Sequence, residues 1–102
     1  MSKWADFLIS AVHYKETKDR KFIQSVMVHE DQGDTVSKPF VLERLGVVKK
    51  IEEGLTFCTI YKKDNKWIRG EDVHIVVIKN VKYIRTDNNN TPMDNLGNLP
   101  EF

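Results

Sequence analysis

A disulfide bond within the chain is excluded, because Cys58 is the only cysteine among the 102 residues. A reducing compartment, the cytoplasm, is therefore the expected location. The first residues do not resemble a secretory signal, since Asp6 interrupts them and the apolar stretch 7–12 is too short. No apolar run approaches the roughly 20 residues that a membrane-spanning helix requires. We therefore expect a soluble, cytoplasmic protein with no membrane partner.

An excess of charge of either sign is also lacking. Sixteen Lys and Arg residues face fifteen Asp and Glu residues, for a formal net charge of +1. This balance argues against a protein that coats a polyanion. The five glycines are scattered singly, so no glycine-rich phosphate loop is present. With 40% hydrophobic and 30% charged residues, the composition fits a globular chain, and its length predicts a single domain over 1–102.

The first half of the chain predicts a hairpin. Residues 5–14 and 22–29 are rich in apolar and β-branched side chains, and the charged segment between them suits a turn. Strict alternation divides residues 5–14 into two faces, one with Phe7, Ile9 and Ala11 and the other with Leu8, Val12 and Tyr14. The two strands are expected to pair antiparallel.

A helix is expected over about 43–53. Val47, Val48 and Ile51 recur at helical spacing, and charged residues fall mostly on the opposite face. Gly54 stands where a left-handed residue ends many helices. The preceding segment 40–42 is expected to be an extended approach or a first turn.

The second half of the chain returns to strands. Residues 55–62 have strand periodicity, the polar segment 63–66 suits a hairpin loop, and Gly70 is expected to break the strand that begins at Trp67. Residues 73–78 and 81–86 flank a two-residue loop in which Asn80 tolerates positive φ. That loop predicts three cross-strand pairs, Val76 with Tyr83, Ile75 with Ile84 and His74 with Arg85.

The tail carries signals of its own. Thr91-Pro92-Met93-Asp94 followed by Gly97 predicts a short helical turn. Three apolar residues of the tail are expected to dock on the body of the protein: Leu96, Leu99 and Phe102. The sequence as a whole thus predicts an α+β fold, with a largely antiparallel sheet of five to six strands, one main helix and a C-terminal helical turn.

Four segments occur in an order that resembles a known family: Gly33-Asp34, Ile51-Glu52-Glu53-Gly54, Tyr83-Ile84-Arg85-Thr86-Asp87 and the ending Asp94-Asn95-Leu96-Gly97-Asn98-Leu99-Pro100-Glu101-Phe102. The chain is similar to small prokaryotic proteins, also found in phage-related genomes, that are catalogued as a domain of unknown function. The resemblance covers nearly the whole chain. It implies a compact α+β fold, and it implies no activity, cofactor or catalytic residue.

An enzyme is one alternative that the residues leave open. His13, His29 and His74 are potential metal ligands, and Cys58 or Asp72 would complete a tetrahedral set. His13 and His29 would be neighbours if the first hairpin paired near its open ends. No local ligand spacing supports this hypothesis, and histidines at strand ends or on the surface are the simpler interpretation.

A nucleophilic site has little support in the sequence. Ser10 and Ser25 lie inside predicted strands without the glycines of a nucleophile elbow. Cys58 alternates with Ile60 on a strand, which is typical of a buried, inert thiol. We therefore favour a non-enzymatic protein without a cofactor.

A basic and aromatic hairpin is the strongest functional signal. The central lysines and arginine are interleaved with two aromatic residues, an arrangement that offers cations to phosphate and a ring to a base. The four predicted binding residues are Tyr61, Lys63, Trp67 and Arg69. A solvated lysine-rich loop is the simpler alternative.

The predicted function is a binding or interaction module, whose partner is a protein or a nucleotide-type ligand. Nucleic acid is a weaker possibility, because the net charge is nearly zero. The phage-related occurrence of similar proteins suggests a third hypothesis, an inhibitor or decoy directed at a host defence protein or signalling nucleotide. Both a monomer and a homodimer are compatible with the sequence.

Overall fold

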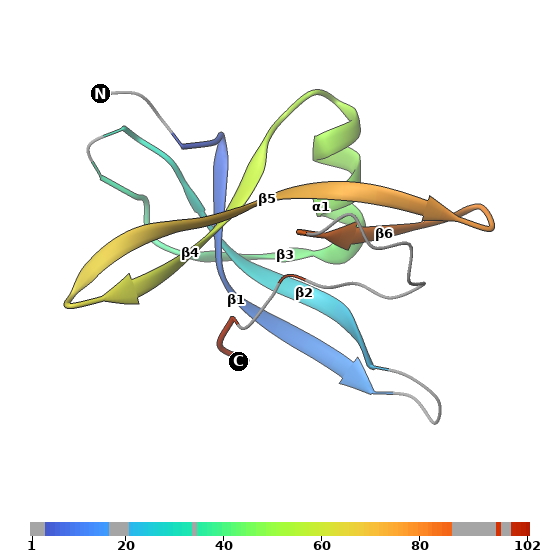
Figure 1. Ribbon diagram of the computed structural model, residues 1–102, viewed down its shortest axis with the longest axis horizontal. Helices are drawn as coiled ribbons and strands as arrows, with labels where there is room; N and C mark the ends of the chain where they lie inside the picture. The colour runs from blue at the N-terminus through green and yellow to red at the C-terminus, as the bar shows by residue number, and fades with distance from the viewer. Residues whose placement is uncertain (1–3, 17–20, 34, 87–95, 97–98) are drawn as a thin grey trace.

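The computed structural model describes residues 4–16, 21–33, 35–86, 96 and 99–102. These residues contain six strands and one helix (Figure 1). In chain order the elements are β1 (Phe7–Glu16), β2 (Lys21–Glu30), β3 (Phe40–Glu43), α1 (Arg44–Glu52), β4 (Phe57–Lys63), β5 (Lys66–Ile78) and β6 (Val81–Arg85). Within the described residues, no helix combines the length and the apolar character needed to cross a lipid bilayer.

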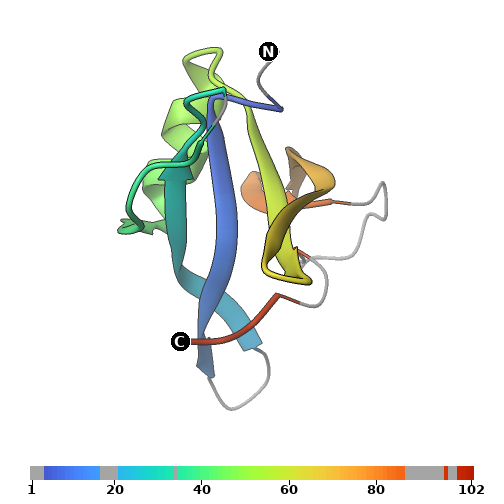
Figure 2. The same cartoon turned by 90° about the vertical axis from the view of Figure 1, so that its left-hand side faces the viewer.

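All six strands belong to one sheet with the order β3-β2-β1-β4-β5-β6. β1 and β4 run parallel, and the other neighbouring strands run antiparallel. Figure 2 shows β1 between β2 and β4, with α1 on the side of β2. The predicted α+β fold with a mostly antiparallel sheet is confirmed. The helical turn predicted from Thr91-Pro92-Met93-Asp94 falls outside the described residues.

The helix lies within the predicted range. Its buried residues are Val47 and Val48, and it packs against β2, β3, β5 and β6. Gly54 follows the C-cap Glu53 with φ of 96°, a left-handed conformation that glycine adopts without strain. The segment before the helix is not a first helical turn, because its residues form β3 and pair antiparallel with β2.

The predicted alternation along β1 is wrong beyond Ile9. Ile9 pairs with Val28 and Ala11 pairs with Met27, so Ser10 is an extra residue in β1. A bulge of this kind shifts the side-chain period by one. Ile9 and Val12 therefore share the main core.

Gly70 does not break its strand, because β5 continues through it for 13 residues. A side chain at Gly70 would bring its Cβ to 3.0 Å from the carbonyl oxygen of Thr59 and closer still to the Thr59 hydroxyl. The Thr59 hydroxyl accepts a hydrogen bond of 3.0 Å from the backbone N–H of Glu71. The register is irregular between Cys58 and Ile60. Gly70 thus permits a close approach of the two strands at an irregularity.

The sheet separates two apolar clusters. The main core lies on the face that α1 covers and collects the following buried residues: Ile9, Val12, Ile23, Val26, Val28, Val47, Val48, Phe57, Val73, Ile84 and Leu96. A smaller cluster contains Ala5, Leu8, Cys58 and Ile60, with Val36 and Trp67 packed against it. The β4–β5 hairpin extends from this smaller cluster.

The tail docks on the body, as the sequence predicts. Leu96 is buried in the main core, and Leu99 packs against it. Near the chain end, Val12 donates a 2.9 Å backbone hydrogen bond to Pro100 and accepts one of 3.0 Å from Phe102. β1 pairs with β4 only from Phe7 to Ile9. The tail lies alongside β1 at Val12, beyond the end of that pairing. Phe102 itself is 42% exposed.

Candidate functional site

The β4–β5 hairpin closes through a two-residue turn. Asp64 and Asn65 have φ of 53° and 64°, the left-handed pair that a tight turn between twisted strands favours. The turn fixes the register, so Lys63 lies opposite Lys66, Lys62 opposite Trp67 and Tyr61 opposite Ile68. Residues that lie directly opposite one another share a face of the sheet. The hairpin therefore has two distinct faces.

One face presents an exposed ring beside two lysines. Tyr61 is 45% exposed, and Lys63 and Lys66 are exposed as well. The structure describes no ion pair or hydrogen bond from either ammonium group to any residue that it places. Two like charges directly opposite one another repel, and this repulsion is relieved when an anion binds between them. We refer to Tyr61, Lys63 and Lys66 as the tyrosine face.

The other face holds Trp67 in a more enclosed setting. The Lys62 ammonium lies 5.1 Å from the centroid of the Trp67 ring, at cation–π distance. The His29 ring lies 5.4 Å away from the same ring, and Trp67 packs against the smaller apolar cluster. The contacts hold the ring in place and leave it half-buried. Trp67 therefore anchors the hairpin to the body.

Arg69 lies on the same face as Trp67. Its guanidinium is 2.7 Å from the carboxylate of Asp72. Burial raises the pKa of the Cys58 thiol, and the nearby Arg69 guanidinium lowers it in part. A buried thiol with a raised pKa is a poor nucleophile, since the thiolate is the reactive form. This arrangement supports the interpretation of Cys58 as an inert residue.

The four residues predicted as a binding site thus occupy both faces. Tyr61 and Lys63 lie on the tyrosine face, whereas Trp67 and Arg69 point to the other side with partners of their own. Lys66 also belongs to the tyrosine face, although it is not one of the four binding residues predicted from the sequence. A two-residue turn at Asp64 and Asn65 would have predicted the position of Lys66, because such a turn places Lys66 directly opposite Lys63.

The three histidines lie apart. In the first hairpin His29 pairs with Leu8 and His13 with Ser25, so the register separates the two rings. His13 hydrogen-bonds to the carbonyl oxygen of Phe102, and His74 lies on β5 opposite Arg85. Among the residues that the structure places, no group of three or more His, Cys, Asp or Glu side chains could hold a metal ion.

His29 has a partner at each ring nitrogen. Its Nε2 lies 2.8 Å from the hydroxyl oxygen of Ser10, and its Nδ1 lies 2.9 Å from the carbonyl oxygen of Ser37. Ser10 is the extra residue of the β1 bulge, and both Ser10 and His29 are buried. The pairing of serine with histidine is also used in nucleophilic catalysis. Here the burial of both residues points to a structural role.

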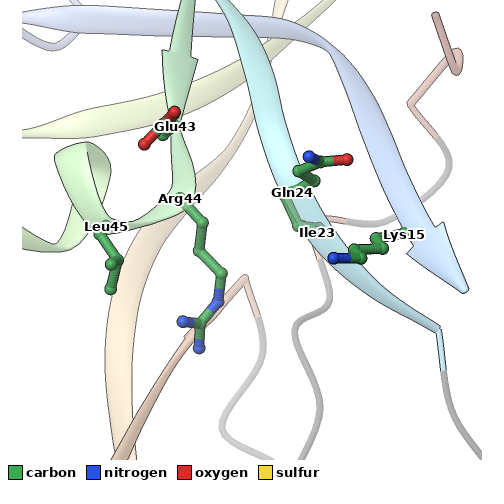
Figure 3. Close-up of a pocket in the computed structure, with 6 residues that line it drawn as sticks. All are labelled: Lys15, Ile23, Gln24, Glu43, Arg44 and Leu45. Carbon is green, nitrogen blue, oxygen red and sulfur yellow. The ribbon is translucent and has the colours of Figure 1, made fainter. Parts of the chain in front are cut away.

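A cavity of about 330 Å³ opens at a distance from the hairpin, between the last residues of β1, the first residues of β2 and the start of α1 (Figure 3). Its lining residues are Lys15, Ile23, Gln24, Glu43, Arg44 and Leu45. The sequence analysis identified none of them as functional, because they come from four elements with no local motif in common.

A family model described as "Protein of unknown function (DUF3892)" matches residues 8–100. No curated protein and no solved structure matches the chain. The matched span includes the helix and all of the six strands except Phe7, the first residue of β1, together with the residues that line the cavity. The resemblance expected from the sequence is confirmed at the level of a family whose function is unknown. The chain belongs to the DUF3892 family.

Proposed function

We propose that the protein is a binding module that takes a nucleotide-type ligand on the tyrosine face of the β4–β5 hairpin. The observation that carries the proposal is the cross-strand pair of Lys63 and Lys66 beside the exposed ring of Tyr61. The ligand's phosphates would lie between the two ammonium groups, and its base would stack on the ring. These are the contacts by which proteins bind single-stranded nucleotides with little sequence preference.

Electrostatics favour an anion at this place. The tip of the hairpin concentrates lysines, and Asp64 in the turn is the nearest carboxylate in the sequence. A bound phosphate would replace the repulsion between Lys63 and Lys66 with attraction to both. Because the ammonium groups are exposed, we expect the affinity to fall as the salt concentration rises.

The aromatic ring supplies the second element of recognition. Tyr61 lies opposite Ile68, which is half-buried, so an apolar side chain adjoins the ring on the same face. Stacking of a base on an aromatic side chain contributes about 1–3 kcal/mol. Trp67 and Arg69 act from the other face as positioning residues, because their contacts with Lys62, His29 and Asp72 fix the strands that carry Tyr61 and Lys63.

Titration with three probes tests the proposal: ATP, tripolyphosphate and adenosine. We expect ATP to bind more tightly than either part alone, because tripolyphosphate lacks the base and adenosine lacks the phosphates. Replacement Tyr61→Ala should weaken ATP binding by about fivefold or more and leave tripolyphosphate binding nearly unchanged. Lys63→Gln should weaken the binding of both phosphate-containing probes.

Lys38→Gln is the matched control, because Lys38 is exposed and lies outside the hairpin. Isothermal titration calorimetry at low salt measures each affinity, and circular dichroism checks that every variant is folded. The proposal is wrong if ATP does not bind, or if Tyr61→Ala and Lys63→Gln bind ATP as tightly as Lys38→Gln.

A further inference from the structure

The nearly neutral charge of the whole chain conceals a positive segment at the tip of the β4–β5 hairpin. Residues 62–66 contain three lysines and one aspartate, which gives a formal charge of +2. The whole chain carries +1, so the other residues together carry −1. Phosphates bound at the tip would respond mainly to this local charge, because salt screens charges that lie farther away. The net charge of the protein therefore does not exclude a polyanion as the ligand of this hairpin.

The lysines of the tip are separated from most carboxylates of the hairpin. β4 contains no Asp or Glu. The nearest carboxylates on β5, Glu71 and Asp72, lie five and six residues from Lys66, which is about 17–20 Å along an extended strand. Asp72 is also paired with Arg69 at 2.7 Å. Within the two strands and their turn, Asp64 is thus the one carboxylate close to the lysines.

The three lysines point to both faces of the hairpin. Lys63 and Lys66 belong to the tyrosine face, whereas Lys62 lies opposite Trp67 on the other face, with its ammonium 5.1 Å from the ring centroid. All three lysines are exposed. A ligand confined to the tyrosine face would leave Lys62 unused, but a chain of phosphates that passes around the tip would contact all three.

The tip has no enclosed shape that would surround a small ligand. Figure 1 shows the β4–β5 hairpin projecting from the body, with its tip far from α1 and β6. Every residue from 61 to 66 is exposed. Sites for free small molecules are concave and bury most of the ligand, whereas this surface covers one side of a nucleotide. Tight binding would therefore need contacts from further units of the same ligand.

The spacing of the tyrosine face suits one unit of such a ligand. Tyr61 and Lys63 are two residues apart on β4, which is about 7 Å along a strand. This spacing is comparable to the distance between the base and the phosphate of one nucleotide. A base stacked on Tyr61 would thus direct its phosphate toward the tip. Because bases inside a duplex are stacked on their neighbours, a single strand is the form that leaves a base free for the ring.

We propose that the partner of the tyrosine face is single-stranded nucleic acid, which passes around the tip from Tyr61 across Lys63 and Lys66 to Lys62. This inference rests on the proposed function, because the nucleotide bound on the tyrosine face becomes one unit of a longer chain. The contacts are with a ring face and with phosphates, so we expect little preference for base sequence.

Fluorescence anisotropy with labelled oligothymidylates of about four and about twelve nucleotides tests the inference. Thymidine triphosphate serves as the competitor that carries the same base in a single unit. The longer strand should bind about tenfold or more tightly than thymidine triphosphate, because several units make contact at once. Its binding constant should fall with salt with a logarithmic slope of about −2, since each of three lysine contacts contributes about −0.7. A duplex of the same length should bind more weakly than the single strand.

Lys62 provides the variant that separates the two proposals, because it lies outside the tyrosine face. Lys62→Gln should weaken binding of the longer strand by about threefold or more and make the salt slope shallower by about 0.7, with ATP affinity nearly unchanged. Lys62→Arg keeps the charge and the contact with Trp67, and it should bind like the wild-type protein. Lys79→Gln is the matched control, since Lys79 is exposed in the other two-residue hairpin turn. Circular dichroism checks that each variant is folded.

The possible results distinguish this inference from the proposed function. If ATP binds at Tyr61 and Lys63 but the longer strand binds no more tightly than thymidine triphosphate, the inference is wrong and the nucleotide site remains. The same conclusion follows if Lys62→Gln binds the strand like Lys79→Gln. A duplex that binds as tightly as the single strand would also overturn the inference. If neither ATP nor the strands bind, both proposals are wrong.

Discussion

The hydroxyl oxygen of Ser10 lies 2.8 Å from Nε2 of His29, and both residues are buried. The carbonyl oxygen of Ser37 accepts from Nδ1, so in the neutral ring Nδ1 carries the hydrogen and Nε2 accepts from the Ser10 hydroxyl. The bulge of β1 is thereby tied to the end of β2 and to the loop that leads to β3.

Replacement Ser10→Ala should therefore destabilise the fold. It removes the donor and leaves Nε2 of His29 buried without a partner, at a cost of about 1–3 kcal/mol in the free energy of unfolding. Ser25→Ala, at a half-buried position of β2, should change that free energy by less than about 0.5 kcal/mol. Urea denaturation followed by circular dichroism measures both values. Equal stabilities for the two variants would contradict a structural role for the Ser10–His29 pair.

Two glycine replacements should have different effects. At Gly70 an added Cβ meets the backbone and hydroxyl of Thr59, and we expect Gly70→Ala to lower the free energy of unfolding by about 1–3 kcal/mol. At Gly46 the added Cβ lies 2.8 Å from the end of the flexible Leu42 side chain, which can move. Alanine also favours a helix interior over glycine by about 1 kcal/mol.

Gly46→Ala should consequently unfold at a similar or higher urea concentration than the wild-type protein, and Gly70→Ala at a lower one. If Gly70→Ala were as stable as Gly46→Ala, the close approach of Thr59 to β5 would not be a feature of the folded protein in solution.

Cys58 should make the stability depend on pH in the alkaline range. Burial raises the pKa of its thiol in the folded state, so the unfolded chain loses the thiol proton first as the pH rises. The unfolded state then binds fewer protons, and stability falls with increasing pH above the ordinary thiol pKa of about 8.5. Cys58→Ala should show a shallower decline. Parallel urea denaturation series at neutral and alkaline pH compare the two slopes, and identical slopes would contradict this assignment.

The register of β5 and β6 shows what the sequence can determine. Lys79 and Asn80 have positive φ, and the two-residue turn fixes three cross-strand pairs as predicted: Val76 with Tyr83, Ile75 with Ile84 and His74 with Arg85. Local turn chemistry determines register because the strands leave the turn directly opposite one another. The helix and its end at Gly54 follow from equally local signals.

Features that depend on distant contacts could not be predicted in this way. The bulge at Ser10 reverses which side chains of β1 face the core after this residue. In the sequence, however, Ser10 looks like any other polar residue of a strand. Gly70 is a residue type that often ends a strand, but β5 continues through it, and its closeness to Thr59 explains why a glycine stands there. The parallel pairing of Phe7 with Phe57 joins segments 50 residues apart, with no turn to indicate it.

The candidate site was predicted only in part for a related reason. The basic and aromatic residues of the sequence identified the β4–β5 hairpin. In a pleated strand, however, neighbouring residues point to opposite faces, so Lys66 and not Trp67 lies on the same face as Tyr61 and Lys63. The cavity is lined by residues of β1, β2, β3 and α1, and the sequence has no local signal that brings these four elements together.

A reversal of charge at Lys66 tests the proposed nucleotide site most directly. Lys66→Glu replaces the repulsion across the hairpin with attraction to Lys63, which should raise the free energy of unfolding by about 0.2–1 kcal/mol. The same change places a carboxylate where the phosphates would lie. Calorimetric titration with ATP, alongside urea denaturation, should therefore find a variant that is at least as stable as the wild-type protein and binds ATP about tenfold more weakly or not at all. A folded Lys66→Glu variant with the ATP affinity of the wild-type protein would contradict the proposal.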